Sequence, residues 1–112
     1  MGVTQLIGNQ AESAAAEQLE RAGLVILTRN YRVKSGEIDI VARDGDTLVF
    51  IEVRKRRNDH YGGAGASIDW RKRERLVRAA QHYLLHLHPT PPCRFDAILV
   101  TGTNSEWIRD AF

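Results

Sequence analysis

The stretch "GEIDIVARDGDTLVFIEVRKRR", Gly36 to Arg57, decides the fold of this chain. Two runs rich in β-branched and aromatic residues, "EIDIVAR" and "TLVFIEVRK", flank the turn sequence "DGD", which is the pattern of a β-hairpin. Each run carries a carboxylate among apolar residues, Asp39 in the first and Glu52 in the second. Because a charge inside a buried strand is costly, these two acids need a specific explanation.

The geometry of the hairpin predicts how the two acids lie relative to each other. A loop of two or four residues around Gly45 pairs positions whose numbers sum to an odd value, which puts Asp39 and Glu52 on one face of the sheet. A Gly45–Asp46 loop would place them directly opposite each other, whereas a three-residue loop would separate them. Side-by-side carboxylates cost several kcal/mol unless one takes a proton or a cation lies between them.

The charge of this pair can be balanced in two ways, and the residues alone leave both open. Strand alternation places Glu52 and Arg54 on the same face, so an ion pair with Arg54 is one structural solution. Arg94, in the later run "RFDAILV", is another. The functional solution is Mg²⁺ or Mn²⁺, hard cations that bind carboxylate and carbonyl oxygens.

The rest of the chain supplies helices and further strands. Helical spacing of Leu6, Ala11, Ala14, Ala15, Leu19 and Ala22 predicts a first helix from about Gln5 to Ala22. The pattern "IDWRKRERLVRAAQHYLLHLH" predicts a second helix, basic outside, that ends before Pro89. "LVILTRN" and "RFDAILV" are expected strands, "YRVKSG" is a polar connection and "EWIRDAF" is a candidate last strand. The order is therefore αβββαβ, typical of an α/β domain.

Composition places the chain among ordinary globular proteins. At 112 residues it has the size of one domain, 1–112, and should bury roughly 65% of its unfolded surface. Cys93 is the only cysteine, which excludes an intrachain disulfide and indicates a reducing compartment, by default the cytoplasm. No run approaches the length of a membrane span, and no signal peptide is visible, so we expect no membrane association.

Positive charge is concentrated in one segment. The net charge of the chain is only +2, but Arg54 to Arg78 holds nine basic residues against three acidic ones. Such clustering favours a polyanionic partner, although a solvated helix face gives the same pattern. The residues expected to contact nucleic-acid phosphates are Arg56, Arg57, Arg71, Lys72, Arg73, Arg75 and Arg78.

The order of these features resembles the PD-(D/E)XK nuclease superfamily: a Glu in the first helix, an Asp on one strand and Glu-x-basic on the next. The pieces "NYR…GEID", "LVFIEVRKR", "RAAQHYL" and "RFD" look like the YraN family, uncharacterised bacterial proteins similar to Holliday-junction resolvases. The resemblance covers nearly the whole chain. It implies a restriction-endonuclease-like αβββαβ core, with a mixed central β-sheet flanked by helices.

The resemblance also implies a site and a reaction. Asp39, Glu52 and the Val53 carbonyl would bind Mg²⁺ or Mn²⁺, and Glu12 would bind it directly or through water. The implied reaction is metal-dependent hydrolysis of DNA phosphodiester bonds, including those of branched DNA. A junction-like substrate would favour a two-fold homodimer. Asp96 either joins this acidic cluster or pairs with Arg94, and the sequence leaves both open.

Arg54 stands where the superfamily pattern has a lysine. Because arginine stays protonated at any working pH, it can stabilise phosphate charge but is a poor general base. Two functions therefore remain open. One is an endonuclease with Glu12, Asp39, Glu52 and Arg54 as catalytic residues, and the other is a catalytically inactive nucleic-acid-binding or protein-interaction module on the same fold.

Overall fold

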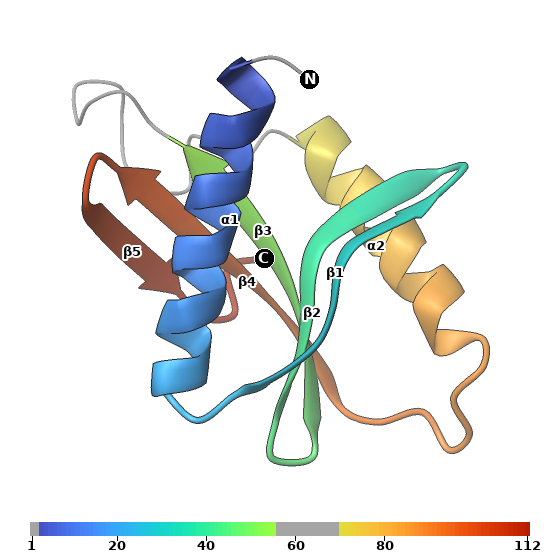
Figure 1. Ribbon diagram of the computed structural model, residues 1–112. Coiled ribbons are helices and arrows are strands. Elements are labelled where there is room, and N and C mark those ends of the chain that lie inside the picture. The colour runs from blue at the N-terminus through green and yellow to red at the C-terminus, as the bar shows by residue number, and fades with distance from the viewer. Residues whose placement is uncertain (1–2, 56–69) are drawn as a thin grey trace.

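The computed structural model describes residues 3–55 and 70–112 (Figure 1). The elements in chain order are α1 (Val3–Arg21), β1 (Val25–Val33), β2 (Gly36–Asp44), β3 (Thr47–Lys55), α2 (Trp70–Leu84), β4 (Cys93–Thr101) and β5 (Asn104–Ile108). The expected α/β class and αβββαβ order are confirmed, and the candidate last strand is present as β5. That strand begins and ends earlier than "EWIRDAF", because the chain turns after Ile108.

The five strands form one mixed sheet in the order β1-β2-β3-β4-β5. Neighbouring strands are antiparallel, except that β3 and β4 are parallel. A parallel pair needs a crossover connection, and α2 lies in the connection between these two strands. The mixed sheet flanked by helices is therefore confirmed (Figure 1).

The β2–β3 hairpin has the tightest of the expected connections. Asp44 pairs with Thr47, which leaves Gly45 and Asp46 as a two-residue loop. Gly45 has a φ of 61°, a left-handed conformation that glycine adopts without steric cost. The ladder continues to the pair Ile40–Ile51, so Asp39 and Glu52 are the next residues in register.

The β1 strand is longer than the sequence predicts and irregular at two places. It runs on to Val33, so "YRV" belongs to the strand and only the residues after it form the turn. A register shift lies at Leu27, and Asn30 has a φ of 56°. The ladder skips Asn30, whose position in the register lies opposite Asp39. Asn30 therefore lies beside the first acid, whereas the irregularity at Leu27 lies further along the strand pair, next to Val41 and Ala42.

Helix α1 packs on one face of the sheet, through the small side chains of Ala11, Ala15 and Ala16 and through Leu19. These residues form one core with Ile40, Ala42, Val49, Ile51, Ile98 and Val100. Ala14 and Ala22, which the sequence placed on the apolar face, are exposed instead. Alanine is a weak marker of burial, because it suits both faces of a helix.

Helix α2 packs on the opposite face with the residues that helical spacing predicts. Leu76, Ala79 and Ala80 are buried against β2 and β3, and Tyr83, Leu84 and Leu87 pack at the edge of this second core. Residues Leu48 and Phe50 face α2, whereas Val49 and Ile51 face α1, so β3 is covered on both sides. In the part of the chain that the structure describes, no helix is long and apolar enough to cross a membrane.

A close backbone contact joins α2 to the beginning of β2. A Cβ atom at Gly36 would lie 1.9 Å from the carbonyl oxygen of Arg75, so only glycine permits this approach. The β1–β2 hairpin curves over α2 at this point (Figure 1). The contact sets the position of α2 relative to the strand that carries Asp39.

We predict that Gly36→Ala destabilises the protein by about 3 kcal/mol, because the added methyl group overlaps backbone atoms that have little room to move. Gly102→Ala is the control, since its Cβ meets nothing within 4 Å and only its φ of 59° is unfavourable. That change should cost about 1 kcal/mol. Urea unfolding measures both, and equal losses would show that the Gly36 contact is not close.

Candidate functional site

Asp39 and Glu52 meet where β2 and β3 separate. Beyond the Ile40–Ile51 pair, the backbone N–H of Val53 donates to the Asp39 carboxylate, with a distance of 2.8 Å to Oδ2. The two carboxyl groups are also hydrogen-bonded to each other. The predicted placement of both acids on one face is therefore confirmed, and the Asp39 side chain takes the place of a ladder partner.

Burial favours a proton shared by this carboxyl pair. Burial, followed by the negative charge of Asp39, raises the pKa of Glu52 to about 8, although the nearby Arg54 guanidinium opposes the shift. Burial also raises the pKa of Asp39, and the hydrogen bond from Val53 opposes that shift. At neutral pH the Glu52 carboxyl therefore donates to the Asp39 carboxylate, and the pair carries a single negative charge.

Arg54 lies on the same face as Glu52, as strand alternation predicts. Its Nη1 atom is 3.8 Å from Glu52 Oε1, and both side chains are largely buried. This is a long ion pair, so it balances the charge of the acids only in part. The pair therefore combines a shared proton with an adjacent fixed cation.

Glu12 of α1 is buried and is held by two residues of β1. Its Oε1 atom accepts hydrogen bonds from Arg29 Nε and Asn30 Nδ2, each at 3.0 Å. Sequence reasoning missed both partners, although "NYR" was among the distinctive pieces. The left-handed Asn30 could have been anticipated only in general terms, because asparagine is the residue that most readily replaces glycine in that conformation.

Glu12 acts on the carboxyl pair through space. Its negative charge is one of the causes that raise the pKa of Asp39. Within residues 3–55 and 70–112, however, no three His, Cys, Asp or Glu side chains are grouped closely enough to hold a metal ion. The candidate metal-binding set in this arrangement is therefore the two carboxyls of Asp39 and Glu52 with the Val53 carbonyl. That carbonyl faces β2, because the N–H and C=O of one strand residue point to the same neighbouring strand.

An open pocket of about 280 Å³ lies beside Glu52. It is lined by Glu37 and Glu52 from the sheet and by Lys72 and Arg75 from α2. Glu37 was not among the expected site residues, yet its charge contributes to the raised pKa of both buried acids. The pocket thus has an acidic wall next to a basic wall.

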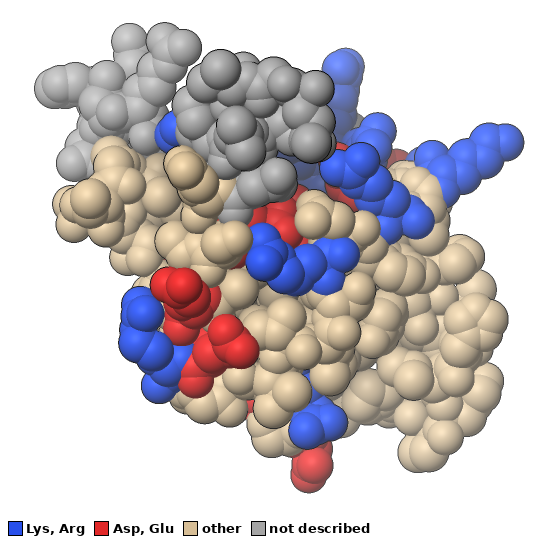
Figure 2. Space-filling model, viewed as in Figure 1, with Lys and Arg blue, Asp and Glu red and all other residues tan. Residues whose placement is uncertain are grey.

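The basic residues of α2 differ in what they contact. Arg71, Lys72, Arg73, Arg75 and Arg78 are all exposed. Figure 2 shows Lys and Arg side chains gathered over the first turns of this helix. The Arg73 guanidinium stacks over the Phe112 ring at 4.7 Å, and Arg78 pairs with Glu74. Of the expected phosphate contacts, Arg56 and Arg57 lie outside the described residues.

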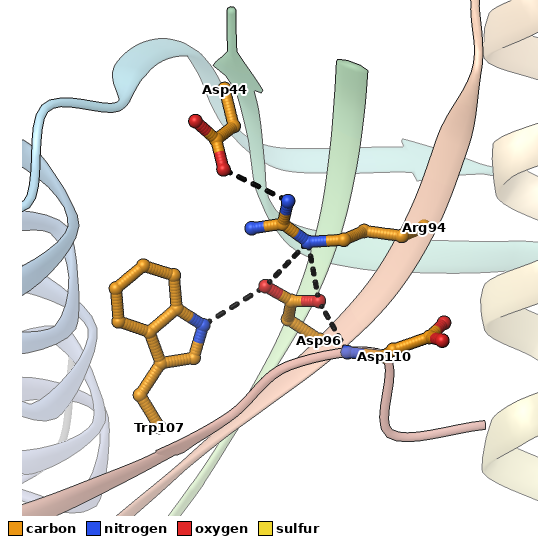
Figure 3. Close-up of polar contacts among 5 residues, drawn as sticks. All are labelled: Asp44, Arg94, Asp96, Trp107 and Asp110. Atoms are coloured by element: carbon orange, nitrogen blue, oxygen red, sulfur yellow. Dashed lines mark hydrogen bonds and ion pairs between the residues drawn. The ribbon is translucent and has the colours of Figure 1, made fainter.

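Asp96 belongs to a separate network (Figure 3). It is fully buried and accepts hydrogen bonds from Arg94 Nε, from Trp107 Nε1 at 2.9 Å and from the backbone N–H of Asp110 at 2.9 Å. Arg94 Nη1 also donates a hydrogen bond to Asp44 Oδ2, at 2.9 Å. Both open alternatives are thus decided. Asp96 pairs with Arg94, and among the described residues Arg94 forms ion pairs with Asp44 and Asp96 rather than with Asp39 or Glu52.

Comparison with known proteins shows the family to which this chain is similar. The model of the family described as "Uncharacterised protein family UPF0102" matches residues 11–100. A UPF0102 protein of Dechloromonas aromatica is 54% identical, with 94% of this chain and 87% of the relative covered. One of Nitrosospira multiformis is 53% identical (96% and 93% covered), and one of Nitrosomonas eutropha is 49% identical (100% and 97%).

We predict that Asp96→Asn lowers the free energy of unfolding by about 3 kcal/mol, because it removes the charge that balances the partly buried Arg94. Asp110→Asn is the control, since only the backbone of Asp110 serves the network and asparagine tolerates its φ of 53°. Denaturant unfolding checks both. An Asp96→Asn midpoint equal to that of the parent would contradict a structural role for the network.

The shared proton makes stability depend on pH. The pKa of Glu52 is 4.5 in its ordinary state and about 8 in the fold, so the unfolded chain loses this proton first. The free energy of unfolding should therefore fall between about pH 5 and 8, by a few kcal/mol.

Glu52→Gln mimics the protonated acid and should remove this fall, so that it matches the parent near pH 5 and is more stable near pH 8. The matched control is Glu20→Gln, at an exposed position of α1. Metal-free unfolding across this pH range is the measurement. Parallel curves for the parent and Glu52→Gln would mean that Glu52 is ionised throughout.

Proposed function

The chain belongs to the uncharacterised family UPF0102, and for this member we propose a metal-dependent endonuclease that hydrolyses phosphodiester bonds of DNA, including branched DNA. One observation carries the proposal. The Asp39 and Glu52 carboxyl groups lie together at the edge of a pocket whose other wall is basic, and burial raises the pKa of Glu52 to about 8. Such a pair suits exchange of a proton for a cation, next to groups that bind phosphate.

The residues present fit Mg²⁺ or Mn²⁺. Asp39, Glu52 and the Val53 carbonyl offer hard oxygen ligands from two strands, while Glu12 is close enough to influence Asp39 and would bind through water. A cation bound there supplies a water of lowered pKa and stabilises the charge that develops on phosphate. Glu52 must release its proton to become a ligand, so metal binding should strengthen as the pH rises towards 8.

The basic wall fits the phosphate backbone of the substrate. Lys72 and Arg75 line the pocket with Glu52, and Arg71 extends the same exposed face of α2. Arg54, on the acid side, holds a fixed positive charge beside Glu52. Phosphates bound by Lys72, Arg75 and Arg71 would bring a scissile bond next to the carboxyl pair.

The resemblance to the YraN family and the PD-(D/E)XK superfamily supports the same proposal. The acids occupy a mixed sheet with α1 on one side and α2 on the other, and they lie on neighbouring strands as that pattern requires. A cytoplasmic protein acting on junctions would further be expected to work as a homodimer, because a junction has two-fold symmetry.

A second function competes with the first: a catalytically inactive module that binds nucleic acid or a protein partner. The observation that favours it is the Arg54–Glu52 contact of 3.8 Å, since arginine can balance the acid without a metal. Binding of DNA without cleavage is the result that would distinguish it.

The proposed nuclease is tested with linear and four-way-junction DNA in Mn²⁺. Asp39→Asn and Glu52→Gln should each lower the cleavage rate by at least about 100-fold, because each removes a charged metal ligand. Asp46→Asn, in the exposed loop of the same hairpin, is the matched control and should cleave as the parent does.

Activity that survives both site changes would belong to a contaminant and would overturn the proposal. If the parent does not cleave, the dependence of DNA affinity on salt concentration distinguishes a nucleic-acid-binding module from one that binds a protein partner. A steep fall with salt supports the binding module, because phosphate contacts release counterions. A flat response excludes nucleic acid as the partner.

A further inference from the structure

The lysines of the chain differ in their access to the acids. There are three, Lys34, Lys55 and Lys72. Lys34 lies in the turn between β1 and β2. Lys55 shares a strand face with Val53, which packs against the α1 core, so it points away from the pocket. Lys72 lines the pocket together with Glu52.

The position of Lys72 is fixed by the fold. Gly36 packs against the backbone of Arg75, which locks the first turns of α2 to the start of β2. Lys72 precedes Arg75 by three residues and therefore lies on the same face of the helix, one turn towards its beginning. Both side chains project from a helix that cannot slide without breaking the Gly36 contact.

Arg54 is less suited to meet the reacting atoms. It lies two residues after Glu52, and its guanidinium is 3.8 Å from that carboxyl. A guanidinium is a rigid planar fork, whereas an ammonium group is a compact charge on a flexible stem, and Lys72 brings such a group to the pocket that Glu52 lines. The charge that the strand position would ordinarily supply can therefore come from α2.

We propose that Lys72 is the active-site lysine of this protein, supplied from α2 in place of the strand position that Arg54 occupies. The inference rests on the proposed nuclease function. The Lys72 ammonium group binds a non-bridging oxygen of the scissile phosphate and orients the attacking water. Arg54 serves Glu52 instead, as a positioning residue.

The reaction balances with water as the only co-reactant. The oxygen of water forms a bond to phosphorus and its proton passes to solvent. The ester P–O bond on the opposite side breaks, its electron pair stays on the leaving oxygen, and that oxygen takes a proton from solvent. The Lys72 charge stabilises the phosphorane-like oxygen atoms while these bonds change.

The test measures kcat and KM on junction DNA in Mn²⁺, together with the Mn²⁺ dissociation constant, for the parent, Lys72→Met, Lys72→Arg and Lys55→Met. Lys72→Met should lower kcat by about 10²- to 10³-fold, the usual effect of removing one group that stabilises transition-state charge. Lys72→Arg should lose less, because it keeps the charge. Lys55→Met should behave as the parent does.

The Mn²⁺ affinity separates catalysis from structure. Lys72→Met should bind Mn²⁺ as tightly as the parent or more tightly, because it removes a cation near the acids. A Lys72→Met kcat within about threefold of the parent would overturn the inference while leaving the nuclease proposal standing, as would a tenfold loss of Mn²⁺ affinity. A parent that binds Mn²⁺ but cleaves no DNA would overturn both.

Discussion

A hydrogen-bonded pair of carboxyl groups, Asp39 and Glu52, is the constraint on which the rest of this structure depends. The two acids lie where β2 and β3 stop pairing, and the Asp39 side chain there accepts the Val53 amide that would otherwise lack a partner. Burial in the sheet raises the pKa of both carboxyl groups, which favours a proton shared between them. The negative charges of Glu12 and Glu37 favour the shared proton, whereas the Arg54 guanidinium opposes it.

Contacts with β1 and β2 hold the two helices near this pair. On one side, Glu12 of α1 is held by Arg29 and by Asn30, whose left-handed backbone interrupts β1 at the level of Asp39. On the other side, Gly36 lets β2 touch the backbone of α2, so that Lys72 and Arg75 face Glu52 across an open pocket. The local irregularities thus gather around the acids, as strained or unpaired residues tend to do at functional sites.

Local periodicity predicted much of this arrangement from sequence. The two-residue loop at Gly45 fixes the register of the hairpin, and the register fixes the common face of Asp39 and Glu52. The apolar face of α2 followed from spacing in the same way, because large apolar residues mark it. The face of α1 was placed less well, since alanine does not distinguish the buried side from the exposed one.

The contacts that the sequence did not predict join residues far apart in the chain. Glu12 is 17 residues from Arg29, and Asp44 is 50 residues from Arg94. Neither arginine can be identified as the partner from the sequence, because several arginines could pair with each acid until the sheet is packed. The role of Asp96 is the clearest case. The sequence around it was compatible both with a metal ligand and with an ion pair, and the hydrogen bond from Trp107 shows that Asp96 belongs to a structural network.

The central claim is that the carboxyl pair exchanges its proton for a divalent cation. Titration of ¹⁵N-labelled protein with Mg²⁺ at pH 8, observed through the backbone amides, tests it most directly. The account predicts saturable shifts centred on Asp39, Glu52 and Val53, absent in Asp39→Asn, with the amides around Asp96 unchanged. Millimolar Mg²⁺ that leaves the Val53 amide where it was, while the protein is folded, would contradict it.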